Sequence, residues 1–186
     1  MRTLFFCLLL SLLAATPASA NEVAAWDALR SGNVVALMRH TDAPGGLGDP
    51  EGFKLEDCAT QRNLSTLGRT KAALVGFAFR NRDIKPARIL SSPWCRCIDT
   101  ARLMEVGPVE VETYFGNPVT WADRREELVR VSRSMVNAWR GPGFMLVVTH
   151  GALIAALTGN NPSEGEIVVV DNSLKTIGRI PRPSGR

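Results

Sequence analysis

The 186-residue chain has only two histidines and lacks the sequence patterns of several large protein classes. It has no internal repeat, and no run of Lys and Arg interleaved with aromatic residues, so we expect no nucleic-acid partner. It has no C-x-x-C pair, which disfavours a thioredoxin-type redox site. The glycines of residues 45–48 open no helical pattern, so we interpret them as a flexible loop rather than a nucleotide-binding loop.

The first twenty residues follow the pattern of a secretory signal peptide. Arg2 is basic, residues 4–13 are apolar, and Ala-Ser-Ala at 18–20 is typical of a cleavage site. The apolar run is shorter than the roughly 20 residues that span a bilayer, and no later run is longer. We therefore predict a signal peptide at 1–20 and a single domain at 21–186, periplasmic or secreted, with no transmembrane segment after signal removal. The alternative is a buried N-terminal helix.

The charge of the chain is mildly positive. Without Arg2 the formal charge falls from +4 to +3, which favours anionic substrates without identifying one. The 166 residues that follow the predicted signal peptide are enough for one domain with a proper core.

Three cysteines follow the predicted signal peptide: Cys58, Cys95 and Cys97. An oxidising compartment makes one disulfide plausible. A bond between Cys95 and Cys97 would close a very small ring, so we expect Cys58 to pair with one of these two. The remaining thiol would be buried or reactive. A redox or metal site at the C-x-C pair is less consistent with the spacing, because structural zinc usually has paired Cys/His ligands. We expect no metal.

Short apolar stretches alternate with helical patterns along the rest of the chain. Strands are predicted at 33–38, 87–90, 109–111, 144–148, 167–170 and 174–180, and helices at 66–78 (capped by Ser65), 95–104, 122–139 and 152–157. Residues 41–63 form a long loop, of the kind that often acts as a lid or binding loop. This alternation predicts an α/β fold of three layers, with a mainly parallel central sheet and helices on both faces.

Both histidines directly follow apolar strands, where α/β sheets bind ligands. Arg39 precedes His40, and Arg96 follows the strand that ends at 91–93. With His150, these residues would place two guanidinium groups and two imidazoles around one crevice, which suits a dianion such as phosphate. A neutral His40, its pKa lowered by nearby arginines, could attack phosphorus and form a phosphohistidine. The other three side chains would stabilise the charge on the transferring group.

Four segments, in order along the chain, resemble signatures of the histidine phosphatase (phosphoglycerate-mutase-like) superfamily. Residues 39–41 (RHT) resemble its R-H-G signature, 64–69 (LSTLGR) its L-[ST]-x-x-G segment, 91–101 (SSPWCRCIDTA) its S-S-x-x-x-R-x-x-x-T-A stretch, and 147–151 (VVTHG) its second-histidine strand end. The resemblance, to an exported bacterial-type member, covers roughly residues 33–158. It implies a phosphoglycerate-mutase-like fold without cofactor, with His40 as the nucleophile and Arg39, Arg96 and His150 as the phosphate pocket.

Three details of this resemblance stay open. Thr41 replaces the glycine of the signature and could contribute a hydroxyl group to phosphate binding. Arg62, in the long loop, is either a further phosphate ligand or an exposed loop residue. The carboxylate that many members use as general acid has no clear match: Glu112 is the first candidate, and Asp42 and Asp123 are the others.

The sequence therefore favours an enzyme, a histidine acid-type phosphatase that hydrolyses phosphoric monoesters or phosphoramidates. Its substrate would be a small phosphorylated compound or a phosphorylated envelope glycan, cleaved through a covalent phosphohistidine intermediate. The alternative is a non-catalytic module of the same fold that binds phosphate groups. A thiol redox protein that uses Cys95 and Cys97 is disfavoured, because no C-x-x-C is present.

Overall fold

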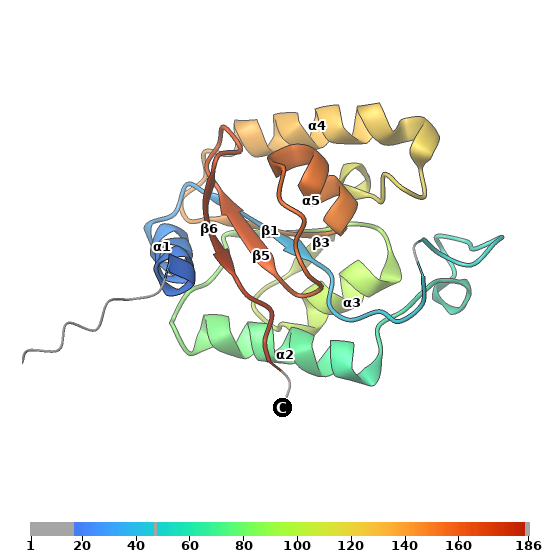
Figure 1. Ribbon diagram of the computed structural model, residues 1–186, viewed down its shortest axis with the longest axis horizontal. Coiled ribbons are helices and arrows are strands. Elements are labelled where there is room, and N and C mark those ends of the chain that lie inside the picture. The colour runs from blue at the N-terminus through green and yellow to red at the C-terminus, as the bar shows by residue number, and fades with distance from the viewer. Residues whose placement is uncertain (1–16, 47, 185–186) are drawn as a thin grey trace, which may run out of the picture.

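The computed structural model describes residues 17–46 and 48–184, and shows one six-stranded sheet (Figure 1). The strands are β1 (Val35–Arg39), β2 (Arg88–Ser91), β3 (Val109–Val111), β4 (Met145–Thr149), β5 (Ile167–Val170) and β6 (Thr176–Ile180), in the order β3-β2-β4-β1-β5-β6. β3, β2, β4 and β1 pair in parallel, whereas β5 is antiparallel to both of its neighbours. The mainly parallel sheet is confirmed.

Helices cover both faces of this sheet. One face carries α1 (Pro17–Ser31), α2 (Thr66–Arg80) and α3 (Cys95–Leu103), and the other carries α4 (Arg125–Ala138) and α5 (Gly151–Thr158). Figure 1 shows α4 and α5 on one side of the strands, with α2 and α3 on the opposite side. The predicted three-layer α/β fold is confirmed.

Alternation of side chains along the buried strands creates two cores. In β1, Ala36 and Met38 pack into the cluster that contains Phe79 of α2, whereas Leu37 packs with Val136 of α4 on the other face. Every second residue of a strand points to the same face, so a strand covered on both sides is apolar throughout. This is why β1 is apolar from Val35 to Met38, and β4 from Met145 to Val148.

Most predicted elements lie within a few residues of the observed ones. Ser65 caps α2 as predicted, because its hydroxyl accepts a hydrogen bond from the Gly68 amide at 3.0 Å. The helix predicted to begin at residue 122 begins as an α-helix only at Arg125, since Ala122–Arg124 form a 3-10 turn (η3). Two further 3-10 turns are η1 (Cys58–Thr60) and η2 (Thr113–Phe115).

Helix α1 has no counterpart among the predicted elements. Its buried positions, Ala25, Trp26 and Leu29, pack into the core, but two small alanines at 24–25 blur the contrast between its faces. The helix begins at Pro17, within the predicted signal peptide. Most of that predicted segment, residues 1–16, lies outside the described residues. Within the described residues, no helix is long and apolar enough to cross a membrane.

A disulfide connects the long loop to the start of α3. Cys58 pairs with Cys95, with a Cα–Cα distance of 5.7 Å, so the expected pairing of Cys58 with one of the two downstream cysteines is confirmed. Cys97 is free and buried, and burial raises the pKa of its thiol to about 12. A thiol that stays protonated at neutral pH is a poor nucleophile, which further disfavours the thiol redox interpretation.

Candidate functional site

The two histidines lie side by side because strands β1 and β4 are adjacent and parallel. Arg39 is opposite Thr149 in the register, so the next residue of each strand, His40 and His150, emerges at the same edge of the sheet. Their ring centroids are 5.7 Å apart, and their exposed fractions are 2% and 3%. The His40 amide donates to the Thr149 carbonyl at 3.0 Å, which extends the strand pairing into the site.

Each imidazole uses one ring nitrogen within the protein. His40 Nδ1 is 2.8 Å from the carbonyl oxygen of Thr41. A carbonyl only accepts, so Nδ1 carries the proton and Nε2 keeps its lone pair. His150 Nε2 is 2.8 Å from the Ser92 hydroxyl. Among the described residues, neither His40 Nε2 nor His150 Nδ1 has a hydrogen-bond partner, so each ring keeps a nitrogen for a ligand.

Burial keeps both imidazoles neutral. Burial lowers the pKa of His40 to about 3; the Thr41 carbonyl opposes this shift, and the charges of Arg96 and two other arginines reinforce it. Burial also lowers the pKa of His150 well below its ordinary value, again with Arg96 as the strongest nearby charge. A neutral imidazole with an available nitrogen is what nucleophilic attack on phosphorus requires.

These pKa shifts predict a loss of stability in mild acid. Because the unfolded chain binds protons on both histidines below pH of about 6.5 while the folded protein does not, stability is full above that pH and falls below it. Between pH 7.5 and 5.5 we expect each histidine to cost about 1 kcal/mol of unfolding free energy. Urea titrations at the two pH values measure this loss.

The control for this prediction is His40→Asn, which should retain about half of the pH dependence. An unfolding free energy that stays constant between pH 7.5 and 5.5 would contradict the neutral state of the two rings. The carboxylate of Asp49 titrates in a separate, more acidic range. Burial raises the pKa of Asp49, but the hydrogen bond and charge of Arg96 outweigh burial and keep that pKa below its ordinary value.

Arg96 forms a fully buried ion pair with Asp49. Its Nη1 donates to Asp49 Oδ1 at 2.6 Å and its Nη2 to Oδ2 at 3.2 Å, and both side chains are 0% exposed. The same carboxylate accepts from the Trp94 indole at 2.9 Å and from the Arg62 amide at 3.1 Å. Sequence reasoning missed Asp49, because nothing in the loop sequence distinguishes it from other loop carboxylates.

Two more arginines converge on Glu164. Arg39 Nη2 is 3.3 Å and Arg62 Nη1 is 3.8 Å from the same oxygen, Oε1. Arg39 also donates to the Pro162 carbonyl at 3.1 Å, and Arg62 donates to the carbonyls of residues 43 and 48. Arg62 is 14% exposed, so it is a member of the site cluster and not an exposed loop residue. Glu164 was also missed, since it lies in the loop before β5.

Thr41 faces α3 rather than an open space. The Thr100 hydroxyl donates to the Arg96 carbonyl, so it accepts from both the amide and the hydroxyl group of Thr41, each at 3.2 Å. Thr41 is fully buried. Its hydroxyl group therefore fixes the turn after His40 against the helix that carries Arg96.

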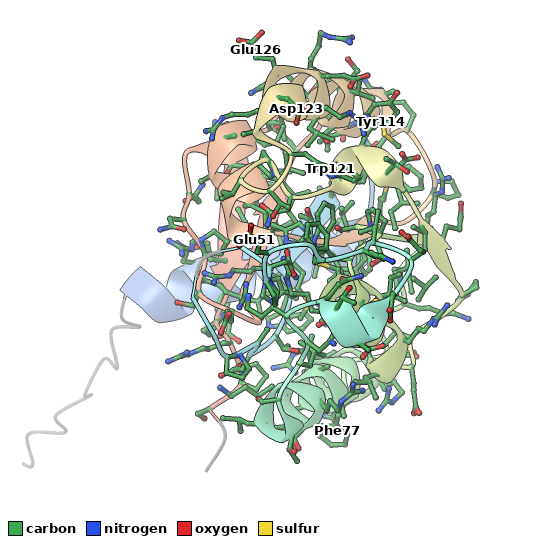
Figure 2. The ribbon with its side chains drawn as sticks, turned by 90° about the vertical axis from the view of Figure 1, so that its right-hand side faces the viewer. Glu51, Phe77, Tyr114, Trp121, Asp123 and Glu126 are labelled. Atoms are coloured by element: carbon green, nitrogen blue, oxygen red, sulfur yellow. A yellow bond between two sulfur atoms is a disulfide. The ribbon has the colours of Figure 1, made fainter. Side chains whose placement is uncertain are left out.

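None of the three candidate general acids is hydrogen-bonded to either histidine. Glu112 caps η2, because its Oε1 accepts from the Tyr114 amide at 3.1 Å. Asp42 pairs with Lys71 at 2.7 Å. Asp123 is exposed in η3, on the segment above the long loop in Figure 2. The structure thus gives each of these carboxylates another environment or role.

Aromatic side chains form one wall beside His150. The Trp94 ring lies 5.1 Å from the His150 ring and 4.6 Å from that of Trp121, and Phe53 stacks on Trp94 at 6.1 Å. Figure 2 shows the long loop, which carries Glu51, in front of the sheet, and the segment with Trp121 above it.

Comparisons with known proteins identify the fold. No protein-family model and no curated protein sequence matches the chain. Among solved structures, the protein histidine phosphatase SixA complexed with tungstate matches with 20% identity over 80% of this chain and 96% of its own, at a TM-score of 0.55. Mycobacterial glucosyl-3-phosphoglycerate phosphatase matches with 19% identity over 80% of this chain and 96% of its own, at a TM-score of 0.52. The neighbours are histidine phosphatases, and this chain has their phosphoglycerate-mutase-like fold.

Proposed function

We propose that this chain, which has the fold of the histidine phosphatases, is a phosphohydrolase that forms a covalent phosphohistidine on His40. One observation carries the proposal: a buried, neutral His40 whose Nδ1 is engaged by the Thr41 carbonyl and whose Nε2 is available beside arginine side chains. A histidine held only for structure would be expected to use both ring nitrogens when buried this deeply.

The reaction has two steps. His40 Nε2 attacks phosphorus, the bond from phosphorus to the leaving group breaks, and the Thr41 carbonyl stabilises the charge that develops on the ring. Water then attacks the phosphohistidine and releases phosphate, which regenerates the neutral imidazole. Arginine donors and His150 stabilise the equatorial oxygens of the transferring group in both steps.

The substrate class follows from the environment of the carboxylates. Glu112 and Asp42 have other partners and Asp123 is exposed, so we infer that none of these three candidates protonates a poor leaving group. Aryl phosphates and phosphoramidates need less proton transfer in the leaving step. We favour small compounds of these kinds as substrates over a phosphorylated envelope glycan. The SixA neighbour, named as a protein histidine phosphatase, is consistent with phosphoramidate chemistry.

The proposed location is outside the cytoplasm, as a single exported domain. The sequence pattern of residues 1–20 and the Cys58–Cys95 disulfide both support export, because disulfides persist in oxidising compartments.

The direct test is to trap the intermediate. The purified protein is mixed with an aryl phosphate carrying a labelled phosphoryl group and quenched within milliseconds in base, where phosphohistidine survives. We expect a labelled protein, a label that acid removes, and continued release of phosphate. Binding of inorganic phosphate with neither label nor release would instead support the non-catalytic phosphate-binding module.

Glu164 provides a further prediction about the pocket. Its carboxylate oxygen bridges Arg39 and Arg62, so it occupies donors that an oxyanion would otherwise use. Glu164→Gln removes this negative charge, and we expect inorganic phosphate to inhibit the variant roughly 3- to 10-fold more strongly. The inhibition constant measures the effect. Glu110→Gln, which changes only a surface ion pair with Arg88, is the matched control. Weaker inhibition of Glu164→Gln would contradict this interpretation.

A further inference from the structure

We propose that Asp49 is a positioning residue, which orients Arg96 so that one edge of its guanidinium group faces the transferring phosphate. The inference rests on the proposed function, because it assigns Arg96 to the phosphate. Asp49 is in the long loop, and Arg96 is the second residue of α3. No sequence motif relates the two residues; only the tertiary structure brings them together.

The contacts divide the guanidinium group of Arg96 into a used edge and a free edge. The used edge is the end of the group, where Nη1 and Nη2 each donate to one oxygen of Asp49. The second hydrogen of Nη1 is directed to the Arg62 carbonyl at 3.3 Å. This leaves the Nε hydrogen and one hydrogen of Nη2, which lie parallel on the neighbouring edge.

The free edge has the geometry that binds a phosphate group. Arg96 Nε is buried and has no hydrogen-bond partner among the described residues, which is costly unless a ligand completes it. Two parallel N–H groups match two oxygens of a phosphoryl group and give specific, charge-assisted binding. Arg96 is close to both histidines, because Sγ of the next residue, Cys97, is 3.6 Å from His150 Nε2. On the other side, Thr100 donates to the Arg96 carbonyl and accepts from Thr41, the residue after His40.

Asp49 is itself held in place on all sides. The Trp94 indole and the Arg62 amide each donate to one of its oxygens, so both oxygens accept two hydrogen bonds. The loop that carries Asp49 is attached to the first turn of α3 by the Cys58–Cys95 disulfide. It is also attached by Gln61, whose side-chain oxygen accepts from the Cys95 amide at 3.0 Å. These contacts hold the guanidinium group in the orientation that leaves its Nε edge free.

A competing role for Asp49 would be an internal plug that occupies the phosphate position. The two roles predict opposite results. A plug removed by Asp49→Asn would let an oxyanion bind more tightly, whereas loss of a positioning residue would weaken binding. Because Asp49 occupies the end of the guanidinium group and leaves the Nε edge free, the geometry favours positioning.

The experiment measures tungstate binding by calorimetry, and kcat and KM for an aryl phosphate, in the wild-type protein and in Asp49→Asn. We expect the variant to bind tungstate at least 10-fold more weakly and kcat to fall more than KM rises. Asp49→Glu, which keeps the charge, should recover part of both. Asp99→Asn, on the same helix but in a surface ion pair with Arg69, should match the wild type. Unchanged or tighter tungstate binding by folded Asp49→Asn would overturn the proposal.

Arg96→Lys separates positioning from a general structural effect. Lysine has no second N–H edge to orient, so Asp49→Asn should weaken tungstate binding much less when it is added to Arg96→Lys than when it is made in the wild type. Equal weakening in the two backgrounds would overturn the proposal. If Asp49→Asn does not fold, Asp49→Glu in the same two backgrounds gives the comparison.

Failure of the proposed function would look different. A wild-type protein that binds tungstate but releases no phosphate would refute the phosphatase and still report on Asp49 through binding. A wild-type protein that releases phosphate, with an Asp49→Asn variant that is equal in every measurement, would refute the role of Asp49 alone.

Discussion

A His40→Ala variant is expected to fold and to release phosphate from an aryl phosphate at least about 10⁴-fold more slowly than the wild-type protein. The variant removes His40 Nε2, the atom that we propose as the nucleophile, while the arginine side chains of the site remain. Steady-state phosphate release, with base-quenched labelling of the protein, measures both the rate and the intermediate. No label is expected on the variant.

His150→Gln is the matched variant for this result. Glutamine can still interact with the Ser92 hydroxyl, which is 2.8 Å from His150 Nε2 in the wild type, so the loss should be confined to stabilisation of the phosphoryl group. We expect turnover to fall by about 10² to 10³, with labelling of His40 still detectable. A His40→Ala variant that keeps a tenth of the wild-type rate would rule out the covalent mechanism.

Removal of the Cys58–Cys95 disulfide should have the largest effect on stability. The bond closes a loop across a sequence separation of 37, for which chain entropy predicts a loss of about 4 kcal/mol in unfolding free energy. The double variant Cys58→Ser with Cys95→Ser, unfolded in urea, measures this loss. Reduced wild-type protein, which lacks the disulfide but keeps both cysteines, is the control. It separates the loss of the bond from the effect of the two serine substitutions.

The same variant should also lose oxyanion affinity under conditions where it is still folded. Cys95 directly precedes Arg96, and the loop on the other side of the disulfide carries Asp49. In the urea measurement, a loss of less than about 1 kcal/mol in the unfolding free energy of the double variant would contradict the stability prediction. It would mean that other contacts already constrain the loop in the unfolded chain.

The residues at the strand ends could be predicted because their position depends on local sequence. An apolar run marks β1 and another marks β4, and each strand ends directly before its histidine. Parallel pairing then places the two ends together. Arg96 is placed in a similar way, because β2 ends at Ser91 and Arg96 lies in the first turn of the helix that follows, α3. The fold class and these candidate residues therefore required only periodicity and the direction of the strands.

The carboxylates could not be predicted, because their partners are far away in the chain. Asp49 pairs with Arg96 and Glu164 contacts Arg39, and both carboxylates are in loops without periodicity. Glu112 shows the converse: its place after β3 suggested a general acid, but an amide two residues away binds its carboxylate first. Whether a carboxylate binds a neighbour in the sequence or a distant residue depends on which donors the folded chain places beside it.

The disulfide partner was likewise decided by helix geometry. Residues two apart in a helix point to nearly opposite sides, so Cys95 and Cys97 could not both face the loop. Cys95 faces Cys58, and Cys97 is buried beside the Thr149 carbonyl and His150. The sequence contained both alternatives, and only the position of the loop selected one.

The parallel pairing of β1 with β4 also predicts when the proposed activity would appear during folding. The two histidines are held together by backbone hydrogen bonds between strands that are separated in the chain by five other helices and strands: α2, β2, α3, β3 and α4. Contacts between strands this far apart in the chain are expected to form late, because closing the long segment between them costs entropy before the contacts can stabilise it. A nascent chain that has made α2 and α3 but not β4 has no second imidazole and no neighbouring strand to extend the turn at His40. We therefore expect the proposed activity to appear late in folding, so that phosphate turnover would report completion of the central sheet.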